Sequence, residues 1–157
     1  MIHRHTTTDV PFTAAQMFEL VADIEKYPDF LPHCAGLRVV SRKGDANNGE
    51  VTADMLVAFK VFREKFRSRV SVDKPAGHIG VEYADGPFKT LLTNWRFVDK
   101  PEGGSVVHFE IDFEFSNLLF QTTAQLIFDK AFAKMCDAFV DRAYDVYPSQ
   151  EEASSAD

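Results

Sequence analysis

The segment LVADIEKYPDFLPHC (residues 20–34) lies between a predicted helix and a series of predicted strands. It is expected to contain the end of one short helix, a second short helix and an exit stopped by proline. Pro28 is tolerated in the first turn of a helix, and Pro32 cannot continue the helix before it. The second helix carries three large apolar side chains, Tyr27, Phe30 and Leu31. A short apolar flap of this kind either closes a hydrophobic core or gates a cavity, depending on what the chain builds beneath it.

Upstream of the flap, the sequence predicts one strand and one helix. Residues 3–10 are rich in threonine, which favours a strand, and we place this strand at the edge of a sheet. Thr13 is a typical N-cap for a helix over residues 14–22, whose apolar residues share one face. Residues 23–31 then supply the second short helix.

Downstream of the flap, apolar and polar residues alternate with a period of two, beginning near Leu37. This period is typical of antiparallel strands with one buried face. Turn-forming residues separate the strands at residues 74–77, 85–87 and 100–104. The predicted inward positions are Val51, Ala53, Met55, Val57, Phe59, Phe66, Ser68, Val70, Val72, Ile79, Val81, Tyr83, Leu91, Thr93, Trp95, Phe97, Val107, Phe109, Ile111, Phe113 and Phe115.

The period changes after Asn117. From residue 118 to residue 147 the sequence has neither proline nor glycine, and apolar residues recur at steps of three and four. This pattern predicts one amphipathic helix about 45 Å long at a rise of about 1.5 Å per residue. Ser116 or Asn117 is the expected N-cap. Pro148 ends the helix, and the acidic tail, residues 149–157, is expected to be disordered.

The predicted order is one strand, two short helices, about six more antiparallel strands and one long C-terminal helix. A sheet of about seven strands twists and curls, and the C-terminal helix is the large apolar element available to cover it. We therefore predict an α+β helix-grip fold, in which a curved antiparallel sheet wraps around that helix. Such a sheet does not close completely around one helix, so a wedge-shaped gap is expected near the flap.

Composition restricts the class of protein. The 157 residues favour a single domain over residues 1–148, and fifteen phenylalanines indicate a broad aromatic interior. A net charge of −7 weighs against general affinity for DNA or anionic membranes. The sequence contains neither an apolar run long enough to span a membrane nor a signal peptide, so we expect a cytoplasmic protein. Cys34 and Cys136 form no metal or redox motif and are expected to be reduced.

Four long motifs occur in order: the flap segment, FREKFRSRV (residues 62–70), DGPFKTLLTNWRF (residues 85–97) and HFEIDFEFSNLL (residues 108–119). Together with Phe139, Arg142 and Ala143, they resemble the coenzyme Q-binding branch of the START-type (polyketide cyclase-like) lipid-binding superfamily. The resemblance covers residues 6–147. It implies a helix-grip fold and non-enzymatic binding of ubiquinone in support of respiration, with no required cofactor.

The same branch contains bacterial ribosome-association toxins with the same motifs, so a second role stays open. The first role implies ubiquinone or a similar isoprenoid lipid as ligand, with the inner-membrane surface or respiratory complexes as partners. The second implies binding to a ribosomal subunit and a block of subunit joining. A cyclase-like enzyme is the third alternative.

If the chain binds ubiquinone, its inward apolar residues would line a tunnel that is entered past the flap and Phe88. An apolar stripe alone is equally compatible with ordinary core packing, so the ligand rests on the resemblance. The predicted tunnel residues are Tyr27, Phe30, Leu31, Val57, Phe59, Phe66, Val70, Phe88, Trp95, Phe97, Phe109, Ile111, Phe113, Phe128, Phe132 and Met135.

Catalysis and metal binding receive little support from the sequence. A cyclase needs ionisable groups in its cavity, whereas the polar inward residues Ser68, Thr93 and Tyr83 can be satisfied by single hydrogen bonds. The five histidines do not cluster at ligand spacing, so no metal site is predicted.

Four basic residues, Arg63, Lys65, Arg67 and Arg69, are predicted to share the outer face of one strand. Such a stripe either pairs with acidic residues on neighbouring strands or forms a docking surface for lipid phosphates or ribosomal RNA.

Overall fold

The structure, a computed structural model, describes residues 2–59, 62–85, 88–115 and 118–147, with side chains described in these ranges except at 59, 62, 85, 88, 115 and 118–128. Seven strands form one antiparallel sheet in the order β1-β7-β6-β5-β4-β3-β2. The elements in chain order are β1 (Ile2–Val10), α1 (Ala14–Ala22), the 3-10 helix η1 (Ile24–Lys26), α2 (Tyr27–Phe30), β2 (Cys34–Gly44), β3 (Asn48–Phe59), β4 (Phe62–Asp73), β5 (His78–Asp85), β6 (Phe88–Asp99), β7 (Ser105–Phe115) and α3 (Leu118–Val146).

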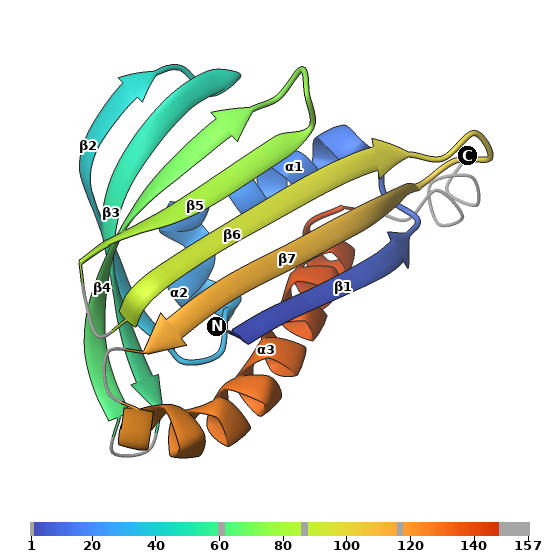
Figure 1. Cartoon of the computed structure of the whole chain (residues 1–157). Helices are drawn as coiled ribbons and strands as arrows, with labels where there is room; N and C mark the ends of the chain where they lie inside the picture. The colour runs from blue at the N-terminus through green and yellow to red at the C-terminus, as the bar shows by residue number, and fades with distance from the viewer. Residues whose placement is uncertain (1, 60–61, 86–87, 116–117, 148–157) are drawn as a thin grey trace.

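The sheet is strongly curved, and α1, α2 and α3 all lie on one side of it (Figure 1). This arrangement confirms the predicted helix-grip fold. The alternation of side chains also has the predicted phase, because Val70, Val72, Trp95, Phe97 and Phe113 are all buried on the inner face. Burial of these side chains removes water from the space between sheet and helices, which is the main stabilising contribution to the fold.

Helix α1 begins where the sequence predicts. Thr13 accepts a hydrogen bond from the backbone N–H of Gln16, whose side chain accepts one from the backbone N–H of Thr13, so both members of a capping box are present. The buried face of α1 consists of Met17, Phe18, Leu20 and Val21.

The flap is divided more finely than predicted. Residues 23–31 form a 3-10 turn, η1, followed by the four-residue helix α2, rather than one continuous short helix. Pro28 lies in the first turn of α2, where its missing N–H donor is not needed, and the change of helix type occurs directly before it. An ion pair between Glu25 and Arg42 of β2 ties this segment to the sheet.

Strands β1 and β2 form the two edges of the sheet. Strand β1 pairs with β7. Strand β2 pairs with β3, with two irregularities of register that the sequence did not predict.

Helix α3 has the predicted extent. Its expected caps, Ser116 and Asn117, and the tail from residue 148 lie outside the described residues. Within the described residues, no helix has the length and apolar character needed to cross a membrane.

Candidate functional site

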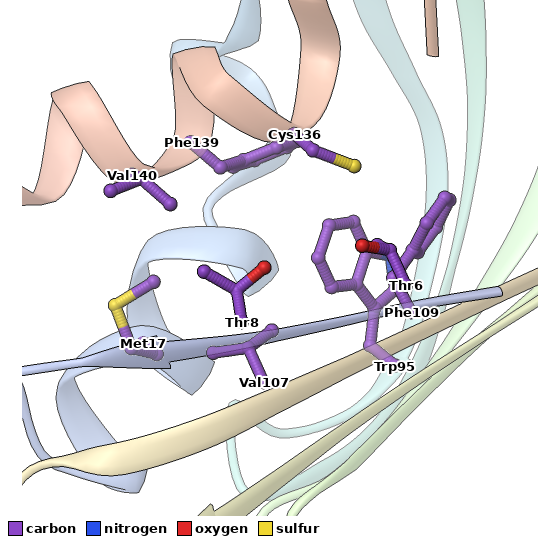
Figure 2. A pocket seen from close by; sticks show the side chains of 9 residues that line it. All are labelled: Thr6, Thr8, Met17, Trp95, Val107, Phe109, Cys136, Phe139 and Val140. Atoms are coloured by element: carbon purple, nitrogen blue, oxygen red, sulfur yellow. The ribbon is translucent and has the colours of Figure 1, made fainter. Parts of the chain in front are cut away.

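A small cavity lies between α3 and the inner face of the sheet near edge strand β1. Its volume is about 20 Å³, which is room for about one water molecule. Strand β1, helix α1, strands β6 and β7 and helix α3 all contribute side chains to its wall (Figure 2). The lining residues are Thr6, Thr8, Met17, Trp95, Val107, Phe109, Cys136, Phe139 and Val140.

The aromatic part of the wall follows from the strand register. Trp95 on β6 pairs directly with Phe109 on β7, and their ring centroids lie 4.3 Å apart. Phe139 of α3 meets Trp95 edge-on, with 5.1 Å between the ring centroids. Such offset and edge-to-face pairs are favourable because the positive edge of one ring meets the negative face of another.

The polar groups of the cavity wall are few and neutral. Thr6 and Thr8 carry hydroxyls, Cys136 carries a thiol, and the indole of Trp95 carries an N–H. Burial raises the pKa of Cys136 to about 11, and the nearby Asp137 carboxylate adds to this rise. The thiol is therefore protonated at neutral pH and is a poor nucleophile.

The flap closes the fold beside the cavity. The rings of Tyr27 and Phe30 lie 5.3 Å and 5.4 Å from the ring of Phe139, and the guanidinium of Arg142 lies 5.2 Å from the centroid of Phe30. The Tyr27 hydroxyl donates a hydrogen bond to the carbonyl of Val21, and burial raises the pKa of Tyr27 above its ordinary value. No residue of α2 is fully buried, whereas Ile24 of η1 belongs to the buried core. Within the flap, α2 therefore covers the core without being part of its interior.

A second contact joins the edge strand to the long helix. The guanidinium of Arg4 on β1 donates to both carboxylate oxygens of Asp129 on α3, at 2.9 and 3.3 Å. The pair lies at the seam between β1 and α3, and Thr6 and Thr8 follow Arg4 on the same face of β1. Arg4 and Asp129 thus link the two elements that carry the polar part of the cavity wall.

The predicted tunnel residues whose side chains the structure describes lie in three environments. Trp95 and Phe109 line the cavity. The side chains of Phe59, Phe88 and Phe128 lie outside the described part of the structure. Val57 is half-buried. The remaining predicted residues belong to the core or pack against it: Val70, Phe97, Ile111, Phe113, Tyr27, Phe30, Leu31, Phe66, Phe132 and Met135.

Sequence reasoning did not select most of the cavity wall. Thr6 and Thr8 share the parity of the buried Ile2 and Val10 along β1, and that alternation is the signal that could have identified them as inward-facing. On α3, the predicted steps of three and four residues included Phe139 but neither Cys136 nor Val140, and they did not distinguish Phe139 from core residues. The missed lining residues are Thr6, Thr8, Met17, Val107, Cys136, Phe139 and Val140.

The basic stripe lies on the outer face of the sheet and is largely paired with acidic residues. Arg67 donates to both carboxylate oxygens of Asp54, at 2.8 and 3.0 Å, and Lys65 lies 3.7 Å from the same carboxylate. Arg69 pairs with Glu82 at 3.3 Å. Arg63 is exposed and forms no ion pair with the residues that the structure describes.

Asp54 is the centre of this outer face. It is buried, and in the register of the sheet it lies between Arg38 on β2 and Arg67 on β4. The hydrogen bonds from Arg67 lower the pKa of Asp54, as do the charges of Arg67, Lys65 and Arg38. The carboxylate is therefore held in its charged form by the basic residues that cover it.

Three histidines on β1 and β7 contact an acidic residue or one another. His3 of β1 lies 2.5 Å from the Asp112 carboxylate, and the rings of His5 and His108 stack at 6.2 Å. Within the described residues, no group of three or more His, Cys, Asp or Glu side chains has an arrangement that could hold a metal ion.

A curled antiparallel sheet that encloses a long helix, with a cavity between them, defines a START-like helix-grip protein. The sequence profile of the family described as polyketide cyclase / dehydrase and lipid transport matches residues 10–140. The chain belongs to this family. A START superfamily protein from Mycobacterium smegmatis has the same fold, with a TM-score of 0.79 at 17% identity, over 92% of this chain and 99% of that one.

Two curated relatives carry different names. The ribosome association toxin RatA of Escherichia coli K12 is 33% identical over 144 residues, which cover 92% of this chain and 88% of the toxin. The mitochondrial coenzyme Q-binding protein COQ10 homolog B of Xenopus laevis is also 33% identical over 144 residues, which cover 89% of this chain and 57% of that protein. Both groups that the sequence motifs indicate are therefore represented among the relatives.

We predict that Phe139 and Phe30 contribute differently to stability. Phe139→Ala should lower the free energy of unfolding by about 3–5 kcal/mol, because this ring is buried against helix, sheet and flap. Phe30→Ala should cost less than half as much, because the ring is only half-buried on the flap. Urea denaturation followed by circular dichroism measures both values, and equal losses would make the flap part of the core.

We also predict that Asp54 contributes to the loss of stability in acid. Its pKa is lowered in the folded state, so its stabilisation is present above the unfolded pKa of about 3.9 and is lost as the pH falls through the folded value. Asp54→Asn should flatten the dependence of unfolding free energy on pH in this range. Glu82→Gln removes a carboxylate from an exposed pair and is the matched control, expected to have little effect. Equal pH profiles for Asp54→Asn and the parent would contradict this role.

Proposed function

We propose that this protein binds ubiquinone or a similar isoprenoid quinone in the cavity between α3, β1, β6 and β7. The observation that carries the proposal is the chemistry of the cavity wall, in which aromatic and aliphatic side chains surround two hydroxyls and one protonated thiol. An uncharged ring with an apolar chain matches this wall, because it requires no charged partner inside the protein.

The cavity, at about 20 Å³, is too small for a quinone ring in this structure, so binding requires an expansion. The flap is the element that can move away from the sheet, because α2 has only half-buried and exposed side chains and the preceding turn η1 is tied to β2 by an ion pair at the surface. Each Å² of apolar ligand surface removed from water contributes about 25 cal/mol. Several isoprene units therefore offset the separation of a few such contacts.

We propose binding rather than catalysis. The cavity wall, as far as the described residues form it, contains no carboxylate, imidazole or amine. The thiol of Cys136 has a raised pKa, and among the described residues no general base lines the cavity beside it to remove its proton. The family description includes cyclases and dehydrases as well as lipid transport, and the composition of this wall supports the latter.

The proposal is tested by extracting the purified native protein with organic solvent and identifying bound lipids by mass spectrometry. We expect a long-chain quinone. Added quinone at a hundred times its dissociation constant should raise the stability of the fold by roughly 2.7 kcal/mol. Extracts without quinone, together with no saturable change in thermal stability when quinone is added, would contradict the proposal.

A cavity-filling variant tests whether the ligand binds in this cavity. Val140→Phe adds a ring to the cavity wall and should reduce quinone uptake by at least roughly tenfold while the fold persists, at a cost of about 1–3 kcal/mol for overpacking. Val146→Phe adds the same ring at an exposed position near the end of the same helix and should bind quinone as the parent does. If Val140→Phe does not fold, Cys136→Met is the milder substitution. Unchanged uptake in a folded cavity-filling variant would place the ligand elsewhere.

A second candidate function is association with a ribosomal subunit through the outer face of β2–β4. This face carries five basic side chains. Arg38, Lys65 and Arg67 surround the buried carboxylate of Asp54, and Arg63 and Arg69 lie farther along β4. This excess of positive charge lies on a protein with a net charge of −7. A local basic patch of this kind can contact RNA phosphates, and the relative from Escherichia coli is named for ribosome association.

The outer face is tested with a double variant that spares the Asp54–Arg67 pair. If the face binds ribosomal RNA, Arg38→Ala combined with Arg63→Ala should weaken co-sedimentation with ribosomal subunits. It should also reduce the slope of log affinity against log salt by roughly one for each lost phosphate contact. Lys130→Ala with Lys134→Ala removes the same charge from the exposed side of α3 and is the matched control. Co-sedimentation that is absent in the parent, or equal in all three proteins, would contradict this role.

A further inference from the structure

We propose that Thr6 and Thr8 form the polar subsite that binds the carbonyl oxygens of the quinone ring, an inference that rests on the proposed quinone binding. Both residues lie on the inner face of edge strand β1 and line the cavity. Figure 2 shows their side chains and those of α3 on facing sides of the cavity. The proposal therefore gives a direction to the ligand, with its polar end at β1.

The state of the two hydroxyls supports this assignment. Thr7, on the outer face of the same strand, lies 3.5 Å from the ring nitrogen of His108. The side chains of Thr6 and Thr8 form no hydrogen bond with the residues that the structure describes. Two half-buried hydroxyls that face a cavity are available to a ligand or to a water molecule.

The aromatic surface beside the hydroxyls suits a flat ring. Thr6 pairs with Phe109 in the register of β1 and β7, and Phe109 in turn pairs with Trp95 on β6. The two rings meet 4.3 Å apart in the cavity wall. The two carbonyls of a quinone ring lie at opposite ends of the ring, so a ring in contact with Trp95 and Phe109 whose carbonyl axis runs along β1 would bring one oxygen to each hydroxyl, since residues two apart on a strand are separated by about 6.8 Å. Aromatic stacking would fix the plane of the ring.

The surrounding charges favour a neutral ligand. Arg4, the nearest cation along the inner face of β1, is occupied by the two carboxylate oxygens of Asp129. An anionic ligand would have to separate this pair. A hydroxyl, in contrast, can donate to the carbonyl oxygen of a quinone or accept from the hydroxyl of a quinol. The subsite should therefore accept both redox forms of the ligand.

The test compares two probes of equal chain length on the full-length protein. One is a ubiquinone analogue with a saturated ten-carbon chain, and the other is benzene with the same chain. The variants are Thr6→Val and Thr8→Val, which replace each hydroxyl by a methyl group, and Thr7→Val is the matched control on the outer face. Dissociation constants are measured by equilibrium dialysis, and circular dichroism confirms that each variant is folded.

We expect Thr6→Val and Thr8→Val each to weaken binding of the quinone probe by roughly 2- to 12-fold, the loss of one neutral hydrogen bond. Binding of the hydrocarbon probe should not weaken, and Thr7→Val should bind both probes as the parent does. Thr6→Ser and Thr8→Ser, which keep the hydroxyl, should bind the quinone as the parent does. Loss of binding in these serine variants would assign the two residues a packing role and overturn the subsite.

The remaining outcomes separate the subsite from the proposed function. A parent that binds the quinone probe, with valine variants that bind it equally well, overturns the subsite and leaves quinone binding intact. Valine variants that lose both probes to the same extent also overturn it, because the effect is then not specific to the carbonyl oxygens. A parent that binds neither probe overturns the proposed function, and the subsite fails with it.

Discussion

The side chain of Phe139 on α3 contacts both the sheet and the flap, and its burial holds these elements together. It is 3% exposed and contacts Trp95 of the sheet and Tyr27 and Phe30 of the flap, with ring centroids between 5.1 and 5.4 Å away. It also lines the cavity, whereas Tyr27 and Phe30 do not. A sheet curved around one helix can bury its inner face only if that helix stays in place. One buried ring therefore joins the stability of the fold to the closure of both the flap and the cavity.

The architecture could be predicted from the sequence because it follows from two periodicities of apolar residues, one typical of strands and one typical of helices. Alternation along the strands and steps of three and four after Asn117 identified the sheet, its inner face and α3, and Thr13 marked the start of α1. The cavity could not be predicted in this way. Its position depends on how α3 is rotated and set over the sheet, and periodicity does not distinguish Cys136 or Val140, which face the cavity, from neighbours that pack into the core.

Thr6 and Thr8 illustrate a second limit of sequence reasoning. A threonine-rich strand at a sheet edge suggests exposed hydroxyls, yet the parity of Ile2 and Val10 places these two residues on the inner face. Polarity and periodicity give opposite indications here, and periodicity is correct. Such a conflict is expected at functional sites, where a hydroxyl in an apolar surrounding costs stability unless a ligand or water molecule satisfies it.

The inner and outer faces of the sheet differ in the charge of their polar groups. Inside, the polar groups of the cavity wall are neutral, and the nearest ion pair, Arg4 with Asp129, stays at the seam. Outside, Asp54 is buried beneath basic side chains on β2 and β4, at the other end of the strand order from β1. A neutral lipid and an RNA phosphate would therefore use different faces and different strands. The curved sheet carries both faces, and the Glu25–Arg42 ion pair ties the flap beside the cavity to β2, so occupancy of the cavity can alter the outer face through the curvature of the sheet or through the flap.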